Sequence, residues 1–262
     1  MTLGSAFLDR IEQPTKRSLQ TLLDEAVDDT TVQLQKQGHS VTDHQIRKLS
    51  YVHYHDWERD DPTHVFLSTH PGTVTGAHSS VLADSGVPDE KSPPREWVRV
   101  DRRFGVNWLA VRNSGFSSEF FSTLDEAGLI DLGGSWEQYL DQKAFFDEFY
   151  LTPTIKYRSE SVETSAYHDS FQEFVLDELC AIDPEWTFVF GRPAWNALRK
   201  ELDPQPVRGS PDSPEKITEC HAVPHRVTGP LETTIVPLCH VNNQSMKRSE
   251  YMDRLRSGLE PA

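Results

Sequence analysis

The chain has 262 residues, of which 36% are hydrophobic, and a formal net charge of −15 at pH 7. This length suits one large α/β domain or two small ones, and without a run of about 18 apolar residues no membrane span is predicted. The early charges of the N-terminal stretch are unlike a secretory signal, and the three scattered cysteines form no Cys-x-x-Cys pair, which argues against a disulfide framework or an all-cysteine metal site.

The predicted elements begin with an N-terminal helical extension, residues 1–60, packed on a domain that spans residues 61–262. In the extension, an amphipathic helix is predicted over about residues 5–35 and a shorter one over about 42–50. In the domain, four short apolar segments lack clean alternation, which is typical of strands buried on both faces. These segments are residues 64–69, 149–155, 186–190 and 233–239.

Helices are predicted between some of these strands. Apolar residues at helical spacing indicate helices over residues 116–128 and 170–182, and a further helix opens after Gly191. Strands that alternate with helices predict an α/β fold, a three-layer α/β/α arrangement around a central, mainly parallel four-stranded sheet. Residues 73–115 look irregular, and residues 203–230, with six prolines, are predicted to run over the surface.

Polar and ionisable residues follow each predicted strand. In parallel α/β sheets, ligands bind beyond the carboxyl ends of the strands, so these segments form the candidate site. They are Ser68-Thr69-His70-Pro71-Gly72, Lys156-Tyr157-Arg158, Gly191-Arg192-Pro193-Ala194 and His240-Val241-Asn242-Asn243-Gln244-Ser245.

Four segments in this order resemble motifs of the uracil-DNA glycosylase superfamily: STHPG, YLTPTIKYR, DPEWTFVFGRPAWNAL and TTIVPLCHVNNQSMKR. The superfamily has a short turn of the Gly-Glu-Ala-Pro-Gly type after its first strand and a histidine loop after its fourth. The resemblance covers about residues 60–258. It implies the superfamily's three-layer fold and hydrolysis of the N-glycosidic bond of a flipped uracil or related damaged base in DNA. It implies no cofactor, because the four cysteines of the iron–sulfur branch are missing.

The resemblance also implies catalytic roles for two histidines. His240 matches the catalytic histidine and would donate a hydrogen bond to the carbonyl oxygen of the departing base; a strand-end histidine satisfied by backbone groups is the alternative. His70 would position or activate a water, or contact the flipped nucleotide, unless it is simply a turn residue. The rest of the first motif, Ser68, Thr69, Pro71 and Gly72, would shape the turn that approaches the substrate.

Further residues are candidates for contacts with the base and the DNA backbone. Phe104 would stack on the base, with Trp97 and Trp108 as competitors and a core role as the alternative. Asn242 or Asn243 would either read a pyrimidine edge through its amide or cap the last helix. Four basic residues would contact phosphates, or else pair with local carboxylates: Arg102, Arg103, Lys247 and Arg248.

Two features favour rival functions. Pro153 stands where the superfamily places the asparagine that reads uracil, which favours a glycosylase-fold protein that binds nucleic acid or nucleotide without removing a base. Histidines in the first part of the chain suggest a metal-assisted hydrolase as another alternative. No third ligand at fixed spacing accompanies the His-x-His pair, so the main interpretation includes no metal. These histidines are His53, His55, His64, His70 and His78.

The acidic composition bears on the partner and the surroundings. Lysine is scarce beside arginine, 9 against 17, which suits a halophilic protein, with an ordinary acidic cytosolic protein as the alternative. Such charge repels DNA, but at molar salt the Debye length is about 3 Å and the repulsion is screened. We therefore expect a cytoplasmic monomer that binds DNA, without a membrane and without an obligate protein partner.

Overall fold

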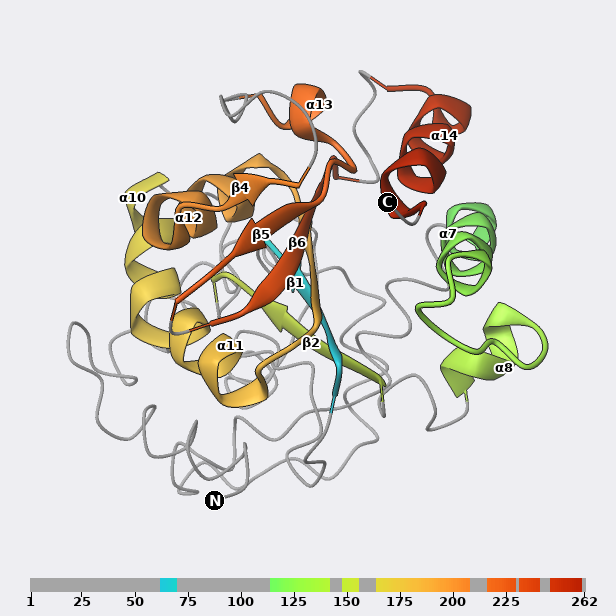
Figure 1. Cartoon of the computed structure of the whole chain (residues 1–262), viewed down its shortest axis with the longest axis horizontal. Coiled ribbons are helices and arrows are strands. Elements are labelled where there is room, and N and C mark those ends of the chain that lie inside the picture. Colours follow the sequence, from blue (N-terminus) through green and yellow to red (C-terminus); the bar gives the residue numbers. More distant parts are fainter. Residues whose placement is uncertain are drawn as a thin grey trace, which may run out of the picture.

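A computed structural model describes residues 62–69, 114–141, 148–155, 164–207, 216–229, 231–240 and 246–260. These residues form a mixed α/β fold around a mainly parallel sheet (Figure 1). The predicted N-terminal extension, residues 1–60, lies outside the described residues. Its helices and the domain boundary therefore stay predictions.

Four parallel strands form the larger part of the sheet, in the spatial order β2-β1-β3-β6. The strands are β1 (His64–Ser68), β2 (Phe149–Pro153), β3 (Trp186–Phe190) and β6 (Thr233–Leu238). All four were predicted from their apolar runs, and β1 and β3 are buried along nearly their whole length because helices cover both faces of the sheet. The prediction of a mainly parallel sheet is confirmed.

Two antiparallel strands extend the sheet beyond β6, so the prediction of four strands was wrong. β5 (His225–Val227) pairs with β6, and β4 (Gln205–Pro206) pairs with β5, which gives six strands among the described residues. Both lie in the proline-rich stretch that was predicted to be a surface excursion. β5 alternates buried, exposed and buried residues, but three residues are too few for this alternation to stand out in the sequence.

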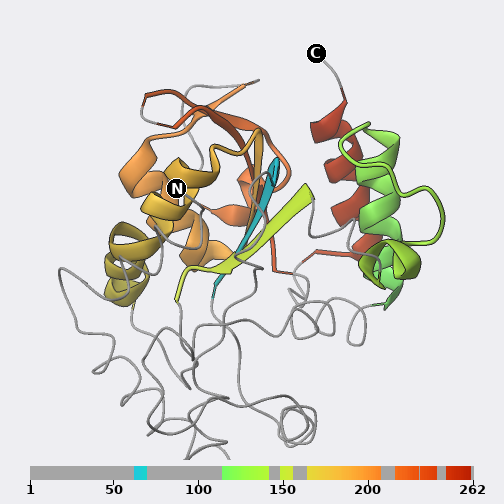
Figure 2. The same ribbon diagram turned by 90° about the horizontal axis from the view of Figure 1, so that it is seen from below.

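Helices lie on both sides of the sheet (Figures 1 and 2). On one side are α10 (Thr164–Ser170), the π-helical segment η1 (Phe171–Val175), α11 (Leu176–Ile182) and α12 (Arg192–Leu202). On the other side are α7 (Ser114–Glu126), α8 (Trp136–Asp141) and α14 (Arg248–Leu259). The short α13 (Ile217–Cys220) precedes β5. None of the described helices is long and apolar enough to cross a membrane.

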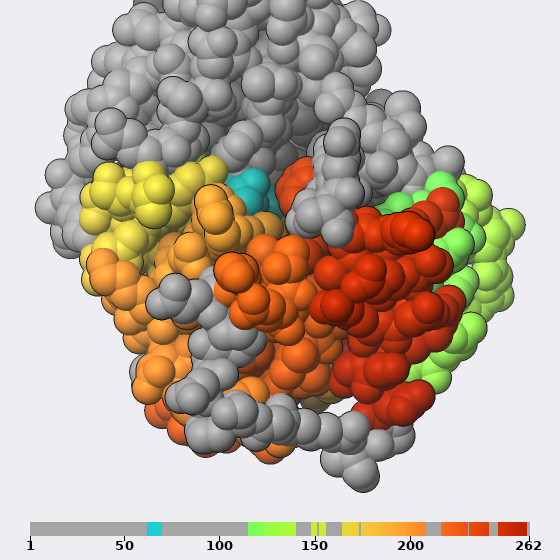
Figure 3. Space-filling view, turned by 90° about the horizontal axis from the view of Figure 1, so that it is seen from above, coloured from blue at the N-terminus to red at the C-terminus, as the bar shows by residue number. Residues whose placement is uncertain are grey.

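The core joins the sheet to both groups of helices. Phe66 of β1 stacks on Phe149 at a ring-centroid distance of 4.5 Å and contacts Phe120 of α7 at 5.7 Å. Trp195 of α12 is fully buried and packs against His225 of β5 at 5.0 Å. In the space-filling view the red surface of α14 lies beside the green surface of α7 (Figure 3). The sheet thus packs between two groups of helices.

Candidate active site at the strand ends

The end of β1 is fixed by bonds to the segment that follows β2. The carbonyl oxygen of Ser68 accepts hydrogen bonds from the backbone nitrogen and the hydroxyl of Thr154, both at 2.8 Å. The carbonyl oxygen of Thr69 accepts one from the nitrogen of Ile155 at 3.0 Å. Ser68 and Thr69 are both half-buried. These bonds fix the backbone from which the predicted turn, residues 70–72, departs.

Gly191 lies where the ends of three strands, β1, β3 and β6, come close to one another. Its N–H donates to the carbonyl oxygen of Leu238 at 2.8 Å, which ties the end of β3 to the end of β6. Its φ is +92°, and a Cβ at this position would lie 2.8 Å from Cγ2 of Thr69, which follows β1. Only glycine meets both conditions without strain. Gly191 is also the N-cap of α12, so the positive end of that helix dipole lies at this edge.

The strand register sets the spacing between the first and last motifs. Leu67 pairs with Val189, and Val189 pairs with Pro237, so these three residues form one row across β1, β3 and β6. Neighbouring strands lie about 4.8 Å apart, which places the ends of β1 and β6 about 10 Å apart. His70 follows β1 by two residues and His240 follows β6 by two. His70 lies outside the described residues, so its position opposite His240 stays a prediction.

His240 lies at the exit end of the buried strand β6, one residue beyond Cys239. It is partly buried, and this burial lowers the pKa of its imidazole below the usual 6.5. The ring is therefore mainly neutral at pH 7. A neutral imidazole donates a hydrogen bond from one ring nitrogen and accepts one at the other, which suits it to bind a developing oxyanion as a hydrogen-bond donor.

Cys239 is held by two side chains that sequence reasoning missed. Its N–H donates to Nδ1 of His221 at 3.1 Å, and its carbonyl oxygen accepts a bond from the hydroxyl of Tyr251 at 3.2 Å. His221 precedes Cys239 by 18 residues and Tyr251 follows it by 12. No local motif signals such a contact, because it depends on how the turn before β5 and helix α14 pack together.

The two basic residues at the start of α14 differ in their surroundings. Lys247 is exposed and is the N-cap of the helix, so neither Asn242 nor Asn243 occupies that position, and the capping alternative for them was wrong. Arg248 forms a bidentate ion pair with Glu119 of α7, with nitrogen–oxygen distances of 2.7 and 3.1 Å, and also bonds the carbonyl oxygen of Gly115. Arg248 thus pairs with a local carboxylate, and its contact with a phosphate stays a prediction.

Several predicted site residues lie outside the described residues, and their roles stay predictions. They are His70, Pro71, Gly72, Arg102, Arg103, Phe104, Asn242 and Asn243. Of the predicted site, the described part of the chain includes Ser68, Thr69, His240, Lys247 and Arg248.

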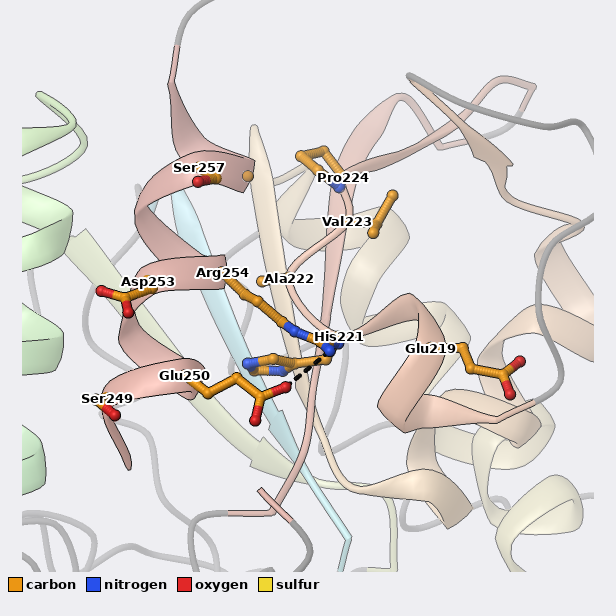
Figure 4. Close-up of a pocket in the computed structure, with 11 residues that line it drawn as sticks. Glu219, His221, Ala222, Val223, Pro224, Ser249, Glu250, Asp253, Arg254 and Ser257 are labelled. Carbon is orange, nitrogen blue, oxygen red and sulfur yellow. Dashed lines mark hydrogen bonds and ion pairs between the residues drawn. The ribbon is translucent and has the colours of Figure 1, made fainter. Parts of the chain in front are cut away.

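A cavity of about 590 Å³ lies between α13, the turn before β5 and α14 (Figure 4). Its wall includes His221 and three carboxylates, Glu219, Glu250 and Asp253. Arg254 crosses it, with bonds of 2.8 Å to Glu250 and to the carbonyl oxygen of Thr218. No predicted site residue lines this cavity, and of the two residues that hold Cys239 only His221 belongs to its wall.

The described residues include no group of three or more His, Cys, Asp or Glu side chains placed to hold a metal ion. Of the histidines in the metal hypothesis, His64 falls within the described ranges. It opens β1, at the end of the strand opposite Ser68, and its Nδ1 lies 2.6 Å from the hydroxyl of Thr63. Its ring is buried against Phe149 and Phe188, and burial lowers its pKa to about 4. His64 is a core residue.

Comparison with known proteins adds no relative. The sequence matches no model of a known protein family, and no curated protein matches it. The resemblance to the uracil-DNA glycosylase superfamily therefore rests on the four motifs and their order along the chain.

Proposed function

We propose that this protein is a DNA glycosylase that hydrolyses the N-glycosidic bond of a flipped uracil or related damaged base. The observation that carries the proposal is the position of His240, which lies two residues beyond the buried end of β6, where Gly191 ties the end of β3 to the end of β6. Helices on both sides of a mainly parallel sheet support the three-layer arrangement of the uracil-DNA glycosylase superfamily.

The proposed reaction separates charge between the sugar and the base. The flipped nucleotide loses its base as the bond between C1′ and the base nitrogen breaks, so the sugar gains cationic character and the base gains negative charge. The N–H of the neutral His240 ring donates to the carbonyl oxygen of the base and stabilises that charge. Water then supplies a hydroxyl group to C1′, and its proton neutralises the departed base.

The acidic chain is proposed to meet DNA in concentrated salt. At a net charge of −15, approach to phosphates is unfavourable in dilute buffer, while multimolar KCl removes the long-range repulsion. Binding then rests on short-range contacts at the strand-end edge. In this proposal the protein is a halophilic cytoplasmic monomer whose partner is DNA.

The test is excision of uracil from a labelled oligonucleotide in 2 to 3 M KCl, followed by alkaline cleavage of the abasic product. The wild type is expected to give product on a uracil strand and none on the matching thymine strand. His240→Ala is expected to lower the rate constant by about 100- to 1,000-fold, as loss of an oxyanion donor does. His168→Ala is the matched control, because His168 lies on α10 and pairs with Glu201 at 3.0 Å. An intact uracil strand after incubation with folded wild type would contradict the proposal.

A second candidate function is favoured by Pro153. This residue ends β2 opposite Ser68, is buried, and has neither a backbone N–H nor a side-chain amide with which to read a base. A protein with the glycosylase fold would then bind nucleic acid or nucleotide without removing the base. Oligonucleotide binding by fluorescence anisotropy, with no abasic product in the same samples, would identify this function.

A further inference from the structure

We propose that His221 and Tyr251 are positioning residues for His240, because together they hold the backbone of Cys239 from both sides. The effect on catalysis rests on the proposed function, while the clamp itself rests on the structure alone. The term clamp denotes His221, Tyr251 and their bonds to the N–H and C=O of Cys239.

The clamp supplies hydrogen bonds to Cys239, directly beyond the end of β6, where no further strand pairing is available. Two residues of β6 form hydrogen bonds on the side of β3: the N–H of Thr234 donates to the carbonyl oxygen of Glu185, and the carbonyl oxygen of Leu238 accepts from the N–H of Gly191. The alternate residues face the opposite edge, toward β5, and the carbonyl of Pro237 accepts the N–H of Ala222 there at 2.7 Å. Cys239 continues this alternation beyond the end of β5. A buried N–H without a hydrogen-bond partner is destabilising, and the ring of His221 supplies the acceptor that β5 no longer offers.

The hydrogen bonds fix the tautomer of His221. Since Nδ1 accepts from Cys239, the proton lies on Nε2, which donates to the carbonyl oxygen of Tyr251 at 3.3 Å. The hydroxyl of Tyr251 in turn donates to the carbonyl of Cys239, and the two rings pack 4.1 Å apart. Both side chains are buried, at 2% and 5% exposure. Cys239, the residue before His240, therefore has both its N–H and its C=O fixed by hydrogen bonds.

Helix α14 supports the clamp from outside. A Cβ on Gly258 would lie 1.9 Å from the carbonyl oxygen of Ala222, so the helix approaches the turn after His221 closely only because residue 258 is glycine. Arg254 adds a bond of 2.8 Å to the carbonyl of Thr218, and its place beside His221 is visible in Figure 4. Because α14 also contributes Tyr251, the helix and the turn together hold Cys239, the residue before His240.

Three substitutions separate the clamp's parts. Tyr251→Phe removes one hydroxyl and keeps the ring, and His221→Gln removes the acceptor at the Nδ1 position. His221→Asn keeps an acceptor oxygen near that position. The control is Tyr139→Phe, which removes the hydroxyl of another buried tyrosine, on α8, where it bonds Glu148. It matches the loss of a buried hydrogen bond without touching Cys239.

In single-turnover excision assays, Tyr251→Phe and His221→Gln are expected to lower the rate constant by about 10- to 100-fold, since small misplacement of a reacting group has effects of that order. Oligonucleotide affinity is expected to stay within about twofold. His221→Asn is expected to restore most of the rate, and Tyr139→Phe is expected to leave it unchanged. An equal loss of rate in Tyr139→Phe and Tyr251→Phe would overturn the proposal.

NMR tests the clamp independently of any reaction. With histidine and cysteine labelled with ¹⁵N, the wild type is expected to show His221 as the Nε2–H tautomer and slow exchange of the Cys239 amide. Tyr251→Phe and His221→Gln are expected to speed that exchange by about tenfold and to move the ring signals of His240. If these changes occur in a protein that excises no base, the clamp stands and the proposed function fails. If both variants leave the His240 signals and the Cys239 exchange unchanged, the clamp is overturned whatever the activity.

Discussion

The two ends of the parallel strands hold buried histidines in different ways. At the entry end, where the parallel strands begin, His64 lies against Phe149 and Phe188, with ring centroids 5.0 and 6.4 Å away. At the exit end, the carboxyl end of the parallel strands, His221 is fixed by hydrogen bonds to Cys239 and Tyr251. Burial lowers the pKa of both His64 and His221 to about 4. The same neutral state thus arises in an aromatic core at one end and in a hydrogen-bonded network at the other.

This difference shows what each end contributes. An aromatic cluster stabilises through buried area and tolerates changes that conserve its volume. A hydrogen-bonded network fixes the geometry of a particular group, and removing one partner leaves the other buried and unpaired. We therefore expect changes at the entry end to alter stability and changes at the exit end to alter the position of His240.

The largest effect is expected from Phe188→Ala at the centre of the aromatic cluster. Phe188 is fully buried and contacts His64, Phe66, Phe120 and Trp186. Its truncation is expected to lower the free energy of unfolding by about 3–5 kcal/mol, while Phe188→Leu is expected to lower it by less than about 1.5 kcal/mol. Urea unfolding measures both. A loss below about 2 kcal/mol for Phe188→Ala would contradict the view that aromatic packing stabilises this end.

At the exit end, Gly191→Ala is expected to lower the free energy of unfolding by about 3 kcal/mol. Part of this loss comes from the φ of +92°, and part from the contact of a Cβ with Thr69 at 2.8 Å. Thr69→Ser removes the contacting methyl group and leaves φ unchanged. In that background Gly191→Ala is expected to be milder by about 1 kcal/mol, which a double-mutant cycle measures. Strict additivity of the two changes would show that Thr69 and Gly191 do not press on each other.

The sequence predicted what depends on local pattern. Apolar runs gave the four parallel strands, and helical spacing gave α7 close to its observed bounds and the start of α12 directly after Gly191. The predicted helix over 170–182 is the end of a longer helical run that begins at Thr164 and includes a π-helical segment. The position of His240 at the end of β6 also followed from order along the chain, because the residue after a buried strand lies at the edge of the sheet.

What the sequence did not reveal depends on packing between distant segments. β5 was missed because its three residues lie among prolines. The clamp was missed because the contact of His221 with Cys239 depends on two features of the tertiary structure. These are the antiparallel pairing of β5 with β6 and the close packing of α14, at Gly258, against the turn after His221. In the sequence, His221 and Tyr251 look like any histidine and tyrosine near apolar residues. Their role exists only in the tertiary structure.

Acidification is expected to destabilise both ends by similar amounts. The folded protein keeps His64 and His221 neutral down to about pH 4, while unfolded histidines protonate near pH 6.5. The unfolded chain therefore takes up protons first, and stability falls as pH decreases from about 6.5 to 4. Each residue is expected to contribute about 2 kcal/mol of loss between pH 7 and 5.

Single-histidine variants divide this acid sensitivity between the two ends. His64→Phe and His221→Gln are each expected to reduce the slope of unfolding free energy against pH, as measured by urea unfolding at several pH values. Only His221→Gln is expected to move the NMR signals of His240 as well, because it removes the acceptor for the N–H of Cys239. A shift of those signals in His64→Phe would mean that the two ends are not independent.

The smallest effect is expected from the exposed link between α7 and α14. Arg248 and Glu119 are 49% and 43% exposed, so Glu119→Gln is expected to cost less than about 1 kcal/mol in dilute buffer. In 2 M KCl the cost is expected to vanish, since the Debye length is then below about 3 Å. The hydrogen bond from Tyr251 to Cys239 is buried, so Tyr251→Phe is expected to lose about 1 kcal/mol at either salt concentration. Thermal unfolding of both variants in the two buffers compares them directly. An equal salt response would mean that solvent reaches the clamp as freely as it reaches the surface ion pair.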